Sequence, residues 1–115
     1  MESNDLARLI VDLIADKKGE DIVLMDLQQV SLIADYFVIG NASSERLLIA
    51  IADSVREEVK KQSERFPLRV EGRGDCGWVL MDYGDVLVHL FSPEVRSYYD
   101  LEGLWAEAPI LVKMQ

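Results

Sequence analysis

The sequence predicts a single-domain α/β fold, a mixed β-sheet with flanking helices spanning residues 1–115. The length of 115 residues fits one compact domain. Half of the residues are hydrophobic and 29% are charged, a composition typical of globular rather than disordered proteins. Apolar runs and helical patterns follow one another in the order helix, strand, strand, helix, strand, strand, strand, helix, and no linker interrupts them. We therefore expect helices packed on one or both faces of the sheet.

The first part of the chain predicts a helix and two strands. Apolar side chains recur at helical spacing between residues 6 and 14, and Ser3 or Asn4 can cap the start of this helix. Asp21–Leu27 and Tyr36–Gly40 are short apolar runs with strand character, separated by a polar turn. We expect one strand over each run.

The second helix has the clearest helical pattern in the chain. Residues 41–44 offer capping side chains, and the charged residues from Arg56 to Lys61 lie outside the apolar stripe. Pro67 is expected to end the helix, and Leu68–Glu71 predicts a short strand. The apolar stripe consists of Leu47, Leu48, Ile51, Ala52, Val55 and Val59.

The segment Gly77–Phe91, GWVLMDYGDVLVHLF, predicts a β-hairpin whose turn contains Gly84 and Asp85. With a two-residue turn, alternation of the side chains gives one aliphatic face that belongs in the core: Val79, Met81, Tyr83, Val86, Val88 and Leu90. The opposite face carries Trp78, Leu80, Asp82, Leu87, His89 and Phe91. A three-residue turn would exchange the faces of one strand relative to the other.

The mixed face of the hairpin has the composition of a contact surface. Its aromatic residues supply large contact area and its polar residues supply direction, so we predict that all six of its residues bind a partner. The pattern leaves an alternative open, in which the protein's own C-terminal helices cover this face.

The C-terminal part predicts two short helical pieces. Ser92 followed by Pro93 is typical of a helix start, and residues 93–99 and 101–106 fit the two pieces. Pro109 ends them, and the residues that follow fit either an added strand or a loose tail.

The charge balance favours a basic partner. Lys and Arg total 12 and Asp and Glu total 21, so the net charge is −9. Such a chain repels phosphate backbones, and no direct nucleic-acid site is expected. A basic protein is the more natural partner.

Cysteine usage and hydropathy predict a cytoplasmic protein without a membrane anchor. The single Cys76 has no intramolecular disulfide partner, and no export signal precedes the first helical pattern. The longest apolar runs are far shorter than the roughly 20 residues of a membrane span.

Residues for catalysis or metal binding are sparse. The only His and the only Cys lack the paired spacing of zinc sites, and we predict no metal, no cofactor and no catalytic residue. One alternative remains, a residual nucleotide-binding or nucleotidyltransferase-type enzyme that uses Gly40, Ser43, Asp82 and Asp85. Against it, Leu80 stands where a second in-face carboxylate for Mg²⁺ would be required.

Several stretches carry a specific resemblance: DIVLMDL, ADYFVI, GNASSERLLIAIADSV, VEG, GWVLMDYGDVLVHLF and RSYYDLEGLW. Across essentially its whole length the chain resembles the ribosomal silencing factor family, also called RsfS or Iojap. The resemblance implies a fold like that of nucleotidyltransferases without their active site, and a translation regulator rather than an enzyme. It further implies binding to the large ribosomal subunit through universal large-subunit protein fourteen, which blocks joining of the small subunit when nutrients are short.

On this reading, Trp78 is the central binding residue of the mixed face. Leu80 and Phe91 form its apolar surround, Leu87 lies on the same face, and Asp82 and His89 make polar contacts to the partner. An exposed tryptophan can also pair across a two-fold axis, so a homodimer is a further possibility. The C-terminal PILVKMQ receives no role from the resemblance.

Overall fold

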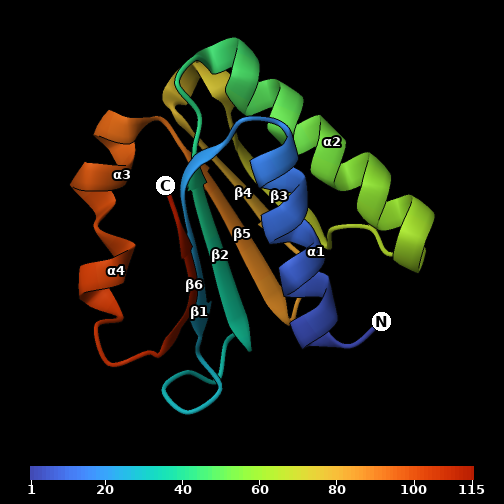
Figure 1. The fold of residues 1–115 in the computed structure, drawn as a ribbon, viewed down its shortest axis with the longest axis vertical. Coiled ribbons are helices and arrows are strands. Elements are labelled where there is room, and N and C mark those ends of the chain that lie inside the picture. The colour runs from blue at the N-terminus through green and yellow to red at the C-terminus, as the bar shows by residue number, and fades with distance from the viewer.

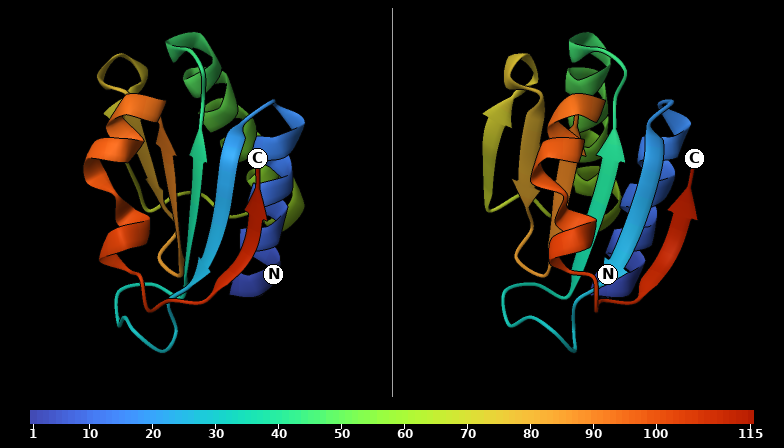
Figure 2. Two further views of the ribbon diagram at one scale, coloured as in Figure 1. Left: turned by 60° about the vertical axis from the view of Figure 1, so that its left-hand side comes forward. Right: turned by 90° about the vertical axis from the view of Figure 1, so that its left-hand side faces the viewer.

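A six-stranded mixed sheet forms the middle layer of the computed structural model, which describes residues 1–115. The strand order is β3-β4-β5-β2-β1-β6, with β3 and β6 at the two edges (Figure 2). Helices α1 and α2 cover one face, and α3 and α4 lie over the other (Figure 1). The elements are α1 Ser3–Asp16, β1 Glu20–Asp26, β2 Tyr36–Asn41, α2 Glu45–Ser63, β3 Arg69–Arg73, a 3₁₀ turn Gly74–Cys76, β4 Trp78–Asp82, β5 Val86–Phe91, α3 Pro93–Tyr99, α4 Leu101–Leu104 and β6 Ile110–Met114. The predicted fold class is confirmed.

Helix α1 buries its apolar stripe against the sheet, but its predicted caps were wrong. Ser3 is already helical, and Glu2 occupies the N-cap position without a side-chain hydrogen bond to the helix. Asn4 instead donates a hydrogen bond of 3.2 Å from its side-chain amide to the Tyr36 hydroxyl. A tertiary contact therefore takes the side chain that local sequence assigned to capping.

Helix α2 begins as predicted and ends earlier than predicted. The Ser44 hydroxyl accepts a hydrogen bond of 3.1 Å from the Leu47 N–H, which satisfies one free donor of the first turn. The helix stops at Ser63 because Glu64 adopts a left-handed conformation with φ of 58°. Pro67, the expected terminator, lies beyond this cap.

The hairpin of β4 and β5 has the register that a two-residue turn predicts. Trp78 pairs with Phe91, Leu80 with His89 and Asp82 with Leu87. The Tyr83 N–H donates to the Val86 carbonyl at 2.9 Å, and Gly84 between them has φ of 91°. The aliphatic residues and the mixed residues therefore occupy opposite faces, as expected.

Strand β2 connects the two halves of the sheet. It runs parallel to β5, with Tyr36 beside Val86 and Asn41 beside Phe91, and antiparallel to β1. Because β2 and β5 point the same way, the capping Ser44 and Ser92 that follow them lie at one end of the sheet. The turn between β4 and β5 lies at the opposite end.

The C-terminal residues form an added strand rather than a loose tail. Strand β6 pairs antiparallel with β1 and extends the sheet at its edge. The two helical pieces before it are separated by Asp100, which adopts φ of 45° and accepts a hydrogen bond from the Gly103 N–H. No helix in the structure has both the length and the apolar character that crossing a membrane requires.

Candidate partner-binding face

The six residues predicted to bind a partner share one face, but α3 and α4 lie over much of it. The structure brings Trp78, Leu80, Asp82, Leu87, His89 and Phe91 to the same side of the hairpin. Four of them are buried: Leu80, Leu87, His89 and Phe91. They lie in or beside an apolar cluster against which Val95, Leu101 and Trp105 of the C-terminal segment pack. The expectation that these four are free for a partner is not met, and the alternative of a self-covered face applies to them.

His89 is neutral and enclosed by aromatic rings. It is 8% exposed, and its ring centroid lies 4.8 Å from that of Phe37 and 6.0 Å from that of Phe91. Burial lowers its pKa to about 4. Neither ring nitrogen has a hydrogen-bond partner in the protein. In this arrangement His89 fills space in the cluster rather than presenting a polar contact.

Trp78 and Asp82 keep partial exposure, and Trp78 borders a surface hollow. The hollow has a volume of about 370 Å³ and is lined by Cys76, Trp78, Glu94, Val95, Tyr98 and Tyr99. We call it the aromatic hollow. Tyr98 is 84% exposed and Tyr99 is also exposed. The indole Nε1 of Trp78 is buried without an acceptor. Sequence reasoning missed the two tyrosines, although RSYYD places two adjacent aromatics at the end of a short helix that cannot bury both.

The residues of the nucleotidyltransferase alternative do not come together. Gly40 and Ser43 lie at the end of β2 next to α2, whereas Asp82 and Asp85 flank the hairpin turn at the other end of the sheet. The Asp82 carboxylate accepts from the Gly84 N–H at 2.7 Å and pairs with Arg69 at 3.3 Å. The Asp82 carboxylate therefore holds the turn, and the Asp85 carboxylate does so through Arg65.

Asp85 forms the stronger of the two turn contacts. Arg65 donates to both of its carboxylate oxygens, at 2.7 and 3.2 Å, and to the Tyr83 carbonyl. Burial alone raises the pKa of Asp85, but the hydrogen bonds and charge of Arg65, with backbone N–H groups, lower it on balance. The same hydrogen bonds raise the pKa of Arg65 against the opposing effect of burial.

Replacing Asp85 with asparagine is expected to lower the free energy of unfolding by about 1 kcal/mol near neutral pH, since the pair is partly exposed. The folded-state pKa lies below the ordinary value of 3.8, so this stabilisation is present above that value and fades as the pH falls through the lowered pKa. Urea unfolding of both proteins from about pH 7 to pH 2 tests this. A difference that stays constant over that range would contradict it.

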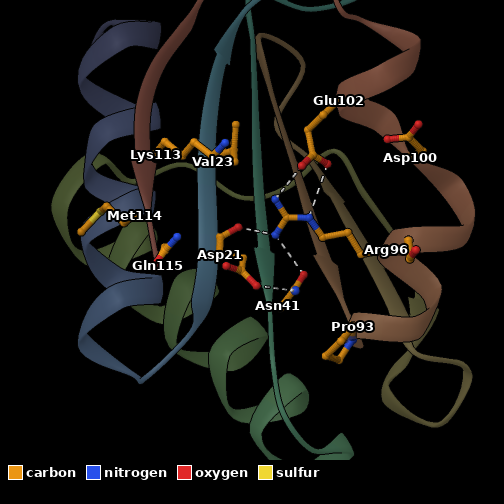
Figure 3. Close-up of a pocket in the computed structure, with 11 residues that line it drawn as sticks. Asp21, Val23, Asn41, Pro93, Arg96, Asp100, Glu102, Lys113, Met114 and Gln115 are labelled. Carbon is orange, nitrogen blue, oxygen red and sulfur yellow. Dashed lines mark hydrogen bonds and ion pairs between the residues drawn. The ribbon is translucent and has the colours of Figure 1, made fainter.

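A buried arginine ties the C-terminal helices to the sheet (Figure 3). Arg96 of α3 donates from Nη1 to the Asn41 Oδ1 at 3.0 Å and to the Asp21 carbonyl. Its Nε and Nη2 donate to the two carboxylate oxygens of Glu102 in α4, at 3.4 and 3.0 Å. Asp21 has φ of 49° and lies where the register of β1 shifts against β2. One guanidinium thus joins α3, α4, β1 and β2, and sequence reasoning missed it.

The chain is similar to known proteins over nearly its full length. The family model described as "Ribosomal silencing factor during starvation" (RsfS) matches residues 1–115. A ribosomal silencing factor of Halalkalibacterium halodurans is 40% identical over 95% of this chain and 92% of its own length. The mouse protein named "Mitochondrial assembly of ribosomal large subunit protein 1" is 31% identical over 84% of this chain and 43% of its own length.

The fold is also that of a solved structure. A crystal structure of a protein from Chromobacterium violaceum superimposes with a TM-score of 0.86, at 34% identity, over 92% of this chain and 88% of that one. Sequence and fold therefore agree with the resemblance that the hairpin and the LEGLW segment suggested. The chain belongs to the ribosomal silencing factor family, whose members are ribosome-associated translation regulators.

Proposed function

We propose that this protein docks on the large ribosomal subunit through universal large-subunit protein fourteen and sterically blocks joining of the small subunit when nutrients are short. It acts by occupying a surface and has no catalytic role. Family membership supports the ribosomal target, and the family description names starvation as the condition. The name of the mouse relative, which refers to the large ribosomal subunit, favours that subunit as the target.

The observation that carries the proposal is the state of Trp78. Its indole is half-buried and lines one hollow together with the exposed rings of Tyr98 and Tyr99. A docked protein can exclude water from the exposed parts of the three rings, as aromatic anchors do at the centres of interfaces.

The charge of the chain supports the same kind of partner. A net charge of −9 attracts a basic ribosomal protein and speeds the first encounter more than it sets the final affinity. Asp82, at the other end of β4 on the same face, is partly exposed and supplies a carboxylate at the edge of the surface. The docking surface that we propose is therefore Trp78 and Asp82 with the two tyrosines, and the buried Leu80, Leu87, His89 and Phe91 support it from below.

Trp78→Ala is expected to weaken binding to isolated universal large-subunit protein fourteen about thirtyfold, because truncating a desolvated interface tryptophan costs about 2 kcal/mol or more. Titration calorimetry measures the affinity, and urea unfolding shows whether the variant is folded. Phe66→Ala is the matched control, since Phe66 is an exposed aromatic outside this face. Equal affinities for the wild type and a folded Trp78→Ala would reject the docking site.

Blocking of subunit joining needs a separate measurement. Light scattering of mixed ribosomal subunits should show less joining with the wild-type protein and restored joining with Trp78→Ala. Binding without an effect on joining would reject the steric mechanism but keep the docking site. Sizing the free protein tells whether a second copy occupies the face, and nucleotide binding in the presence of Mg²⁺ would speak for the transferase alternative.

A further inference from the structure

We propose that the aromatic hollow receives a cationic side chain of the partner, an arginine, between the rings of Trp78, Tyr98 and Tyr99 and the carboxylate of Glu94. The proposal rests on the docking function above and names the chemical group that the surface selects. The docking function requires only that Trp78 be covered. We call the aromatic hollow in this role the arginine receptor. The receptor additionally requires that the partner group which enters the hollow be positively charged.

The rings form angled walls around the hollow. The Trp78 and Tyr99 centroids are 5.9 Å apart with an interplanar angle of 35°, and Tyr98 stands nearly perpendicular to Tyr99, at 86° and 5.4 Å. Helix α3 places Glu94, Val95, Tyr98 and Tyr99 on one side, because residues one turn apart share a helix face. The ring faces of aromatic residues carry negative potential, which attracts a cation held within about 6 Å.

The charged groups of the hollow favour a cation. Glu94 is the one charged residue among its lining residues, and it is exposed. The nearest basic residue in register is Arg73, which pairs with Trp78 across β3 and β4, but its guanidinium forms an ion pair with Asp75 at 3.4 Å. The protein's own cation–ring contacts, Lys60 with Phe66 and Arg65 with Tyr83, lie elsewhere. The hollow thus has a carboxylate and three rings without an internal cation.

An arginine side chain fits the aromatic hollow better than a lysine side chain does. Its planar guanidinium stacks on ring faces and is more weakly hydrated than an ammonium group, so it loses less on entering a partly dry site. It can lie against the rings while donating hydrogen bonds to the Glu94 carboxylate. The volume of about 370 Å³ is enough for one such side chain.

The first test uses small probes on the intact protein. N-acetyl-arginine N-methylamide is titrated while the two indole N–H signals are followed by NMR, with the citrulline analogue as the neutral isostere. The chain has two tryptophans, so Trp78→Phe assigns both signals. We expect the arginine probe to shift the Trp78 signal and leave that of Trp105, whose ring packs on Phe37, unchanged. Equal shifts with both probes, or none with either, would overturn the receptor.

The second test uses purified large ribosomal subunits. Glu94→Gln and Tyr98→Leu are each expected to weaken binding about fivefold, whereas Tyr98→Phe, which keeps the ring, retains the wild-type affinity. Glu107→Gln controls for loss of one exposed negative charge. If Trp78→Ala weakens binding and these two variants do not, the receptor is wrong and the docking function stands. If Trp78→Ala has no effect either, both fail.

Discussion

Arg96→Met is expected to lower the free energy of unfolding by about 3 kcal/mol. The substitution removes the guanidinium and leaves the Asn41 side chain, the Asp21 carbonyl and the Glu102 carboxylate without their donors. Breaking a buried ion pair on one side costs about 3 to 5 kcal/mol. The lower figure applies because the Glu102 side chain is 35% exposed and can regain water. Urea unfolding measures the change.

Two further variants separate charge from shape at this position. Arg96→Lys keeps the charge but lacks the planar fork that contacts Glu102 with two hydrogen bonds, so it should recover less than half of the loss. Glu107→Gln, at an exposed position, should leave stability unchanged. Since Arg96 holds the helix that carries Tyr98 and Tyr99, Arg96→Met should also weaken docking. Wild-type stability in Arg96→Met would refute the structural role of the guanidinium.

Acid should destabilise the protein well above the range in which carboxylates titrate, because of His89. Burial lowers the pKa of His89 from 6.5 in its ordinary state to about 4 in the folded protein. Below pH 6.5 His89 therefore becomes protonated in the unfolded chain, whereas in the folded chain it becomes protonated only near pH 4. The stabilisation is complete above the unfolded pKa and declines through this window by about 3 kcal/mol, at 1.36 kcal/mol for each pKa unit.

A variant without the imidazole isolates this effect. His89→Leu should show a flatter dependence of the unfolding free energy between about pH 6.5 and pH 4, while other titrating groups act equally in both proteins. Its stability at neutral pH should be equal or higher, because the two unpaired ring nitrogens are gone. Urea unfolding along a pH series provides the comparison. Parallel curves for the two proteins would show that His89 stays accessible to protons when folded.

The order of the elements and the hairpin register could be predicted because local signals determine them. Gly84 permits the tight turn, and side-chain alternation then fixes each partner across β4 and β5. Strand β6 could not be chosen over a tail, because Ile110, Leu111 and Met114 at a sheet edge are all exposed and show no alternation. The end of α2 was misplaced because a left-handed Glu64 leaves no mark in the sequence.

The candidate site was predicted in part, because periodicity shows which residues share a face and does not show what covers the face. Trp78 and His89 were correctly placed on one side of the hairpin, yet His89 is buried, whereas Trp78 packs against the edge of the same apolar cluster and stays partly exposed. Arg96 reads as an ordinary surface cation, because its partners Asp21 and Asn41 are far away in the sequence. Burial of a charge through such distant contacts has no local pattern.

Strand β2 pairs with β5 and strand β1 pairs with β6, and both pairings limit how fast the chain folds. Both pairings join strands from distant parts of the sequence, so large loops must close before either yields favourable contacts. Such a topology has high contact order, which favours folding in milliseconds to seconds rather than microseconds. A fragment ending after α2 would leave both edges of the β1–β2 pair unmatched, and we expect it to remain unfolded or to aggregate.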